Sequence, residues 1–248
     1  MLCPTFAAMA QRIEILYDDS DLVMVNKPSG MLTIPDRHDP SLPSLRRLAQ
    51  AQLGQELWIV HRLDRDTSGV VCFAKNEAAH RHVSILFQNH EVTKFYAGLV
   101  HGRVSPESGR IEAAIAPDPS QAGKMMVSRS GKMAVTDYRV TAQWPLYALL
   151  QLQIHTGRTH QIRVHMRHLG HSIVGDKLYG DGQPLLLSAF KKKYRLSTKD
   201  EEERPLLNRL ALHAYELSFE KADGTLVKGE APLPKDMAVA VKQLDKWS

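Results

Sequence analysis

Cysteine is scarce in this chain of 248 residues, and so are aromatic side chains and long apolar runs. Its 2 cysteines, Cys3 and Cys72, lie too far apart to predict a disulfide framework or a zinc site, which favours a reducing, cytoplasmic setting. No run approaches the roughly 18 consecutive apolar residues of a transmembrane helix. Residues 1–11 lack the basic start and apolar core of a signal peptide, and we interpret them as a short N-terminal tail.

Basic charge is plentiful by comparison, with a formal net charge of +5 and a pI of about 9.2. A modest excess of this kind is compatible with a polyanionic partner but does not establish one. The basic residues gather in segments 124–132, 158–177 and 191–195. A groove lined by these segments would suit a phosphate backbone. For segment 191–195, a set of solvated lysines is an equally good interpretation.

Short apolar strands separated by hairpin turns predict an α+β fold with a mixed, largely antiparallel central sheet flanked by helices and loops. Strands are predicted over 13–16, 22–25, 57–60, 70–74, 94–100, 133–140, 146–154 and 210–219. Helices are predicted over 45–53, 77–87, 159–169 and 237–247, with Ser44 and Asn76 as caps of the first two. We expect one domain over 12–248, and the charged, irregular segment 183–207 is the best candidate for an insertion.

The segment 61–69, with the sequence HRLDRDTSG, holds the densest cluster of special residues. Asp64 lies between Arg62 and Arg65, and apolar runs on both sides predict a loop between two buried strands. A carboxylate held there by cations stays ionised and fixed, as a nucleophile or general base must be. Spacing alone favours a loop salt bridge. The density of special residues in one loop between core strands favours catalysis.

A second dense segment, HTGRTHQIRVH over 155–165, combines a Thr-Gly turn with several cations. Such a turn at a helix start presents backbone N–H groups to an anion, and the arginines could bind phosphate or steady a carboxylate. The alternative is a basic amphipathic helix packed on the sheet with its arginines exposed. His160 and His165 lack the spacing and the acidic ligand of a zinc helix, so we predict no metal site.

Other motifs narrow the function further. Tyr96 at a strand start could stack on a planar base, although taken alone it is better explained as an ordinary half-buried tyrosine. The segment NKPSG over 26–30 lacks the glycine spacing of a phosphate loop and is interpreted as a turn. The chain has no G-x-G-x-x-G and no G-x-S-x-G, which argues against a dinucleotide oxidoreductase and a nucleophile-elbow hydrolase.

Together and in this order, the segments resemble the RluA family of RNA pseudouridine synthases. The resemblance rests on LVMVNKPSG (22–30), HRLD and TSG (61–69), KFY (94–96), TGRTHQIRVH (156–165), GD and YG (175–180) and LALHA (210–214). Each segment alone is weak evidence, and the ordered set is specific. It covers roughly residues 13–219.

The resemblance implies that the protein converts uridine in RNA to pseudouridine. The N1 glycosidic bond breaks, the uracil rotates and a carbon–carbon bond forms from C5, without a cofactor or metal. Asp64 matches the catalytic aspartate of the family, and Arg163 matches the arginine that pairs with it. Tyr96 matches the tyrosine that stacks on the target base, with a candidate role in removing the C5 proton. Whether Asp64 attacks the sugar or the base, or takes the 2′ proton, stays open.

The resemblance also implies contacts with RNA. Arg62 matches the residue that fills the gap left when the target nucleotide flips out. Ile162 and Leu212 match apolar seats around the uracil, and Arg158 and His160 are further candidates for RNA contacts. No S4-type RNA-binding domain is expected, so the basic loops would hold the substrate. We expect the protein to be a monomer. Its expected partners are ribosomal RNA, transfer RNA or both, and we expect it to bind neither DNA nor a membrane.

Two other functions remain as alternatives. A non-catalytic RNA-binding or ribosome-assembly module would use the same basic cleft, although a pure binder gains nothing from a carboxylate that faces phosphates. A glycosidic or phosphate-ester hydrolase is disfavoured, because a typical glycosidase needs two facing carboxylates and the sequence offers no second candidate as well placed as Asp64.

Overall fold

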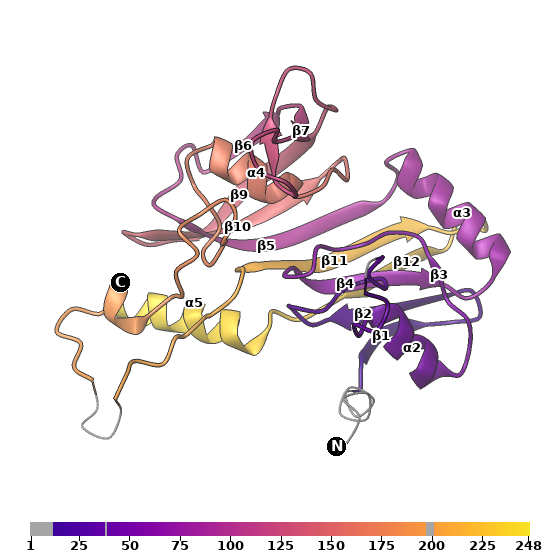
Figure 1. The fold of residues 1–248 in the computed structure, drawn as a ribbon, viewed down its shortest axis with the longest axis horizontal. Helices are drawn as coiled ribbons and strands as arrows, with labels where there is room; N and C mark the ends of the chain where they lie inside the picture. The colour runs from indigo at the N-terminus through magenta and orange to yellow at the C-terminus, as the bar shows by residue number, and fades with distance from the viewer. Residues whose placement is uncertain (1–11, 38, 197–200) are drawn as a thin grey trace. The chain divides into compact units, whose positions relative to one another are not determined.

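The computed structural model describes residues 12–37, 39–196 and 201–248. The chain divides into two compact units, each described below by itself. Unit 1 consists of residues 1–94 and 214–231, and unit 2 of residues 95–213 and 232–248. The chain therefore passes between the units at 94–95, at 213–214 and at 231–232. Figure 1 labels the elements of both units.

Unit 1 is built on a sheet. Its strands are β1 (Glu14–Asp18), β2 (Leu22–Lys27), β3 (Trp58–Ile59), β4 (Ser68–Ala74), β11 (Leu212–Glu220, in unit 1 from Ala214) and β12 (Leu226–Glu230). The order is β1-β2-β4-β11, with β3 paired to β4 and β12 paired to β11. The pairs β1–β2, β2–β4, β3–β4 and β11–β12 are antiparallel. The register sets Lys27 opposite Gly69, so β2 ends beside the start of β4.

The core of unit 1 surrounds β4, in which every residue is buried. A strand covered on both faces reads as a continuous apolar run, as Val70 to Ala74 does. On this sheet packs α3 (Glu77–Gln88), through buried Val83 and the half-buried Leu86 and Phe87. Asn76 caps α3 as predicted, because its side chain accepts a hydrogen bond from the Ala79 N–H at 2.9 Å.

Ser44 precedes α2 (Leu45–Leu53), which has the bounds that the sequence predicts. Its hydroxyl makes no capping hydrogen bond, however. The N–H groups of Leu45 and Arg46 instead donate to the carbonyl oxygens of Leu32 and Thr33, at 2.8 and 3.1 Å. The start of α2 is therefore tied to the chain that follows β2.

Unit 2 contains a second antiparallel array with the order β5-β10-β9-β6. These strands are β5 (Thr93–His101), β6 (Ser108–Glu112), β9 (Val135–Gln143) and β10 (Tyr147–Ile154), and β7 (Ile115–Pro117) pairs with β8 (Met125–Val127) in a two-stranded sheet. The helices are α4 (Gln161–His168), α5 (Lys235–Trp247) and the 3₁₀ turn η1 (Leu187–Ala189). Val164 of α4 packs with Ile115, Ala134 and Tyr179 in a small core.

The predicted α+β class, with a mixed, largely antiparallel sheet and flanking helices, is confirmed. Sequence reasoning missed β6, β7, β8 and β12, which are at most 5 residues long. Such strands are too short to show a pattern, and their pairing with a neighbour decides that they form. The helix predicted from Thr159 begins instead at Gln161.

The predicted tail, residues 1–11, lies outside the described residues, and so does Cys3. In segment 183–207, the described residues form η1 and turns but no α-helix or strand. Leu185 and Leu207 tie its ends together through a hydrogen bond from the Leu185 N–H to the Leu207 carbonyl oxygen at 2.8 Å. The identity of this segment as an insertion, and the single domain over 12–248, stay predictions.

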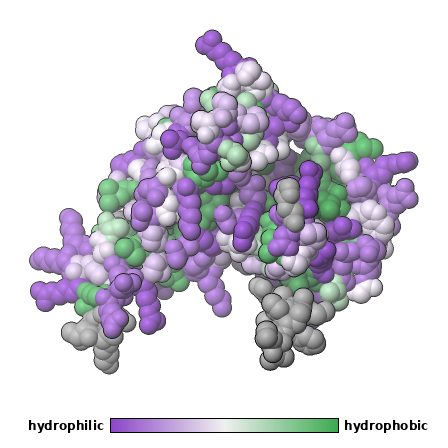
Figure 2. All heavy atoms as spheres, in the orientation of Figure 1, coloured by the Kyte–Doolittle hydropathy of each residue, from purple (hydrophilic) through white to green (hydrophobic). Residues whose placement is uncertain are grey.

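Hydrophilic side chains cover most of the face shown in Figure 2, and apolar ones form small patches. Among the described helices, none has the length and apolar character to span a membrane. Cys72 lies buried in β4 as a free thiol.

Candidate active site

Asp64 lies in unit 1, on the loop that connects β3 to β4. It is half-buried, whereas Arg62, Arg65 and Asp66 in the same loop are exposed. A hydrogen bond from the Thr67 N–H to the Asp64 carbonyl oxygen, 3.2 Å long, closes a turn around it. Arg62 makes no hydrogen bond or ion pair with the part of the chain that the structure describes, which leaves its guanidinium available to a ligand.

Lys27, at the end of β2, anchors this loop from within. Its side chain is fully buried, and its Nζ donates to the carbonyl oxygens of Pro28, Met31 and Arg65 at 3.0, 2.8 and 2.8 Å. An ammonium has three donors, so these three acceptors use all of them. A buried charge is tolerated when it is hydrogen-bonded in this way. Lys27 thereby fixes the carbonyl group of Arg65, the residue that follows Asp64.

Other hydrogen bonds fix the loop on both sides of Asp64. The Thr33 hydroxyl donates to the Leu63 carbonyl oxygen at 2.9 Å and accepts from the Leu63 N–H at 3.2 Å. The Ser29 hydroxyl donates to the Asp66 carbonyl oxygen at 2.6 Å. The backbone at residues 63, 65 and 66 is thus held by the chain that follows β2. Lys27 and Ser29 thus give the NKPSG segment, whose residues alone suggested a turn, the role of anchoring residues 65 and 66.

Gly69, at the start of β4, completes this end of the loop. Its φ is +119°, and a Cβ there would overlap the Ala214 carbonyl oxygen on β11. No other L-residue fits this backbone conformation together with so close an approach. The glycine therefore lets the strand behind the Asp64 loop pack against β11.

His61 anchors the beginning of the loop as a neutral imidazole. Its Nε2 accepts a hydrogen bond from the Cys72 N–H at 2.9 Å, and its ring stacks on Phe87 with the centroids 4.7 Å apart. Burial, and to a smaller extent the charge of Lys94, lowers the pKa of His61 to about 3. Burial also lowers the pKa of Lys94 to about 8. Although part of the His61 residue surface stays accessible, these ring contacts desolvate the imidazole.

Arg163 lies in unit 2, on α4, where it is buried. Its Nε and Nη2 donate to the two carboxylate oxygens of Asp176, both at 2.8 Å, and its guanidinium lies 4.9 Å from the centroid of the Tyr179 ring. Paired bonds of this kind fix both the position and the direction of a guanidinium. The alternative of a helix with exposed arginines therefore does not hold for Arg163.

Asp176 is the second half of this buried pair. It also accepts hydrogen bonds from the N–H groups of Leu178 and Tyr179, at 2.9 and 3.0 Å. Burial alone would raise the pKa of Asp176, but the hydrogen bonds and charge of Arg163, with the two N–H donors, hold this pKa below its ordinary value. Sequence reasoning quoted the Gly175–Asp176 motif without giving Asp176 a role.

The turn before α4 is organised by the side chain of Gln161. Its Oε1 accepts hydrogen bonds from the Thr156 hydroxyl at 2.7 Å and the Arg158 N–H at 3.1 Å. One backbone N–H that the sequence offered to an anion is therefore already bonded. His160 adopts a left-handed conformation with φ of 55°, which makes Gln161 the first helical residue.

The remaining residues of unit 2 that were predicted to contact RNA or the target base either form hydrogen bonds or are buried. His160 Nδ1 lies 2.8 Å from the Tyr179 hydroxyl, and Arg158 Nε donates to the Met133 carbonyl oxygen at 3.0 Å. Tyr96 on β5, Ile162 on α4 and Leu212 at the start of β11 are all buried. The structure thus brings His160 and Arg163 together around Tyr179, a residue that the sequence analysis quoted in the YG motif without giving it a role.

The pairing of Asp64 with Arg163 spans the two units and stays a prediction. Within unit 1, Asp64 shares its loop with Arg62, as predicted. Among the described residues, no group of three or more histidine, cysteine, aspartate and glutamate side chains is arranged to hold a metal ion.

Comparisons with known proteins give one consistent family. A family model described as RNA pseudouridylate synthase matches residues 21–168. The chain is 35% identical over 248 residues to the uncharacterized RNA pseudouridine synthase YlyB of Bacillus subtilis, covering 94% of this chain and 73% of that protein. It is 32% identical to the ribosomal large subunit pseudouridine synthase D of Haemophilus ducreyi, covering 94% and 70%.

A solved structure agrees with these relatives. The structure of human RNA pseudouridylate synthase domain containing 4 matches with a TM-score of 0.71 and 28% identity, covering 94% of this chain and 93% of that one.

Proposed function

This chain belongs to the RNA pseudouridylate synthase family, and from that premise we propose that Asp64 is the catalytic residue with which it converts specific uridines of ribosomal or transfer RNA. An isomerase of this family acts on RNA. One relative is named for the large ribosomal subunit, which supports ribosomal RNA as a target here. We further propose that the protein acts as a cytoplasmic monomer, with no DNA and no membrane partner.

The anchored loop is the observation that carries this proposal. Lys27, Thr33 and Ser29 fix the backbone at the residues before and after Asp64. An attacking or proton-accepting carboxylate gains rate from being held in one direction, because the cost of orienting it is met during folding. Arg62 lies two residues before Asp64, and its side chain is exposed. This supports the proposal that the Arg62 guanidinium occupies the gap left in the RNA when the target base flips out.

In unit 2, the buried Arg163 is held by Asp176 in a fixed direction. This supports the proposal that Arg163 aligns the Asp64 carboxylate. Tyr96, Ile162 and Leu212 are buried, as residues that seat a uracil would be. Arg158 and His160, on the turn before α4, are proposed to contact the RNA.

Pseudouridine mapping tests the proposal. Ribosomal and transfer RNA would be mapped in cells with and without this gene, and after return of wild type, Asp64→Asn or Asp66→Asn. We expect one or a few sites to be lost on deletion and restored by wild type and Asp66→Asn, but not by Asp64→Asn. Asp66 is the matched control because it is exposed and lies two residues away in the same loop.

Binding and turnover of the purified proteins separate the alternatives. We expect Asp64→Asn to bind RNA nearly as tightly as wild type while its turnover falls at least about a thousandfold, typical for loss of a group that acts as a unit with its neighbours. If Asp64→Asn instead restores every effect of the gene, the protein is an RNA-binding or assembly module. Release of free uracil would indicate a hydrolase.

A further inference from the structure

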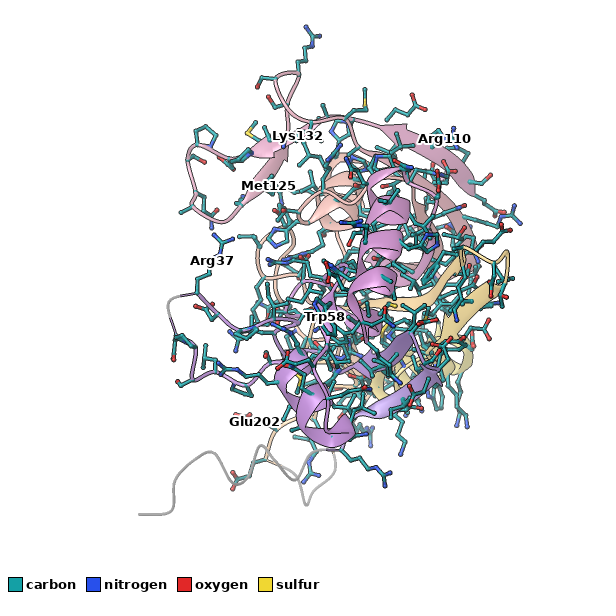
Figure 3. The ribbon with its side chains drawn as sticks, turned by 90° about the vertical axis from the view of Figure 1, so that its right-hand side faces the viewer. Arg37, Trp58, Arg110, Met125, Lys132 and Glu202 are labelled. Atoms are coloured by element: carbon teal, nitrogen blue, oxygen red, sulfur yellow. The ribbon has the colours of Figure 1, made fainter. Side chains whose placement is uncertain are left out.

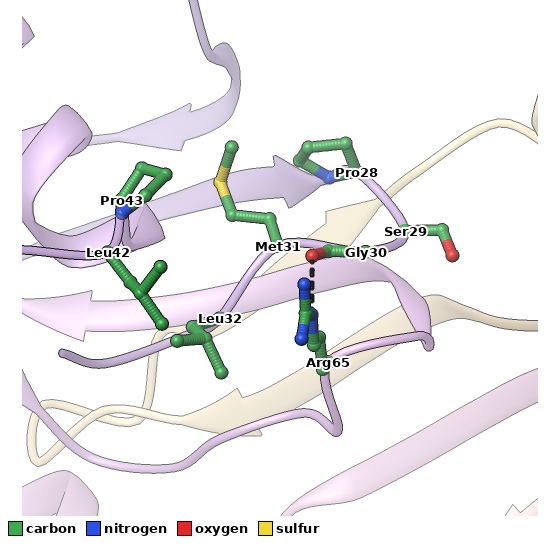
Figure 4. Close-up of a pocket in the computed structure, with 8 residues that line it drawn as sticks. All are labelled: Pro28, Ser29, Gly30, Met31, Leu32, Leu42, Pro43 and Arg65. Carbon is green, nitrogen blue, oxygen red and sulfur yellow. Dashed lines mark hydrogen bonds between the residues drawn. The ribbon is translucent and has the colours of Figure 1, made fainter. Parts of the chain in front are cut away.

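A pocket of about 290 Å³ opens in unit 1 beside the Asp64 loop. Its walls are mostly apolar and come from Pro28, Met31, Leu32, Leu42 and Pro43, with Arg65 at one side (Figure 4). Its volume lies near the lower end of the range for small-ligand sites, about 300 Å³. Leu42 is 38% exposed, so its side chain is accessible to a ligand that enters the pocket.

The two walls of the pocket are joined by backbone hydrogen bonds. Residues 28–32 follow β2, and residues 42–43 precede α2. Leu32 forms a parallel bridge with Ser44, and the Leu45 N–H donates to the Leu32 carbonyl oxygen at 2.8 Å. The pocket is therefore formed before any ligand arrives.

Arg65 connects this pocket to Asp64, to which it is joined by a peptide bond. Its Nε donates to the Gly30 carbonyl oxygen at 3.0 Å, drawn as the dashed line in Figure 4, and its carbonyl oxygen accepts from the Gly30 N–H at 2.9 Å. Its two terminal nitrogens hydrogen-bond to none of the described residues. The planar cation is thus fixed at its base and free at its tip. Arg37, exposed on the loop between the two walls, adds positive charge and projects away from the ribbon in Figure 3.

We propose that this pocket receives the base of a nucleotide next to the target uridine in the substrate RNA, with the Arg65 guanidinium bonded to that nucleotide. The inference rests on the proposed function. When the target nucleotide flips out, its neighbour loses a stacking partner. Proteins hold such unstacked bases against apolar or aromatic side chains and guanidinium planes.

The composition of the pocket favours a base over a phosphate alone. Met31, Leu32 and Leu42 offer no hydrogen bond to an anion, and burying them against a flat ring removes apolar surface from water. Arg65 supplies the polar contact at the edge, where the sugar–phosphate chain of the same nucleotide would leave the pocket.

Methyl NMR of the full chain tests the inference. The sample is the Asp64→Asn variant, and the probes are a short oligouridylate and an abasic ribose–phosphate strand of equal length. We expect the methyl signals of Met31 and Leu42 to shift with the oligouridylate and much less with the abasic strand. The methyl signals of Ile85 and Leu226, which are exposed elsewhere in unit 1, should stay in place.

Two variants give an independent readout. We expect Leu42→Ala to weaken binding of the oligouridylate by roughly tenfold, the size of one lost apolar contact, and to leave its affinity for the abasic strand unchanged. Ile85→Ala is the matched control, because Ile85 is 48% exposed and lies outside the pocket. Equal unfolding midpoints of the two variants would exclude a folding defect.

Each other outcome overturns the inference. If the oligouridylate binds without moving the Met31 and Leu42 signals, the base lies elsewhere, and the proposed function stands. If both strands shift these signals equally, the pocket binds the backbone. If neither strand binds and deletion of the gene removes no pseudouridine, the proposed function fails as well.

Discussion

At the end of β2, the fully buried Lys27 ammonium donates hydrogen bonds to three carbonyl oxygens, one of them that of Arg65 in the Asp64 loop. Loss of a buried partner costs about 1–3 kcal/mol for each group left without a hydrogen bond. We therefore expect Lys27→Met to lower the free energy of unfolding by at least about 2 kcal/mol. It should also lower kcat more than it weakens RNA binding, because Asp64 loses its fixed direction. Urea unfolding and steady-state kinetics would measure both effects.

Lys228→Met is the control for this change. Lys228 forms ion pairs with Glu216 and Glu230 at the surface, where solvent screens the charges, so its replacement should change stability little. If the two variants lose equal stability, the three carbonyl contacts of Lys27 contribute little.

The Arg163–Asp176 pair gives a second prediction at this scale. Asp176→Asn would break the buried ion pair with Arg163, a change that typically costs about 3–5 kcal/mol. We also expect kcat to fall, because Arg163 loses the partner that directs it. Glu112→Gln, which alters an exposed pair with Arg110, should change stability far less than Asp176→Asn does.

The same pair predicts a dependence on pH. Since folding lowers the pKa of Asp176, its contribution is fully present above the unfolded pKa of about 3.9 and is lost as the pH falls through the lower folded value. As the pH falls below about 4, the free energy of unfolding should therefore decrease less for Asp176→Asn than for wild type. Acid unfolding followed by circular dichroism would reveal the difference.

Asp64 and Arg62 stand out in the sequence because several unusual residues crowd one short loop. Lys27 and Thr33 do not, because what makes them important is contact with carbonyl oxygens 38 and 30 positions away, those of Arg65 and Leu63. Local sequence patterns carry no information about a contact between residues so far apart in the chain. Asp176 was visible as a motif, but its partner on α4 follows only from the tertiary structure.

Where β4 meets α3, the neutral ring of His61 joins the two elements by bonding to Cys72 and stacking on Phe87. Between about pH 6.5 and the folded pKa of about 3, the unfolded chain binds a proton at this histidine and the folded chain does not. Stability should therefore fall with falling pH by up to about 1.4 kcal/mol per pH unit in this window.

We expect His61→Gln, whose amide oxygen can still accept from Cys72, to flatten this part of the stability profile. His82→Gln on α3 controls for the removal of a histidine. Urea unfolding at several pH values between 4 and 7 would measure the slopes, and equal slopes in wild type and His61→Gln would contradict the prediction.

Elements with a local signal were predicted well, and those without one were not. α2 and α3 have apolar spacing and a polar residue before them, and their bounds agree with prediction within a residue. The start of α4 was misplaced at Thr159 because the Gln161 side chain closes a turn over the preceding residues and His160 is left-handed. β6 reads SGRIE and forms because β9 offers it a free edge, which no periodicity within β6 reveals.

The net charge of +5 leads to a prediction for the whole molecule. Binding of single-stranded RNA should weaken as the salt concentration rises. In a plot of the logarithm of the binding constant against the logarithm of the salt concentration, each phosphate contact contributes about −0.7 to the slope. The exposed Arg129 and Lys132 belong to segment 124–132, and Lys132 is labelled in Figure 3. Replacing both with glutamine should flatten the slope by about 1.4, whereas replacing Lys235 and Lys242 of α5 should change it less. Fluorescence titrations at several salt concentrations would compare them, and equal changes would exclude segment 124–132 from the interface.

The three crossings between the units impose an order on biosynthesis. The first 94 residues leave the ribosome with β4 lacking its neighbour β11, and the missing strand follows only after 119 residues of unit 2, 95 to 213, have been made. At ordinary translation rates this interval lasts on the order of ten seconds. Throughout it the largely apolar strand β4 lacks β11 along one edge, and such an open edge recruits chaperones or neighbouring nascent chains. The nascent protein is therefore most vulnerable to aggregation while its second unit is being synthesised.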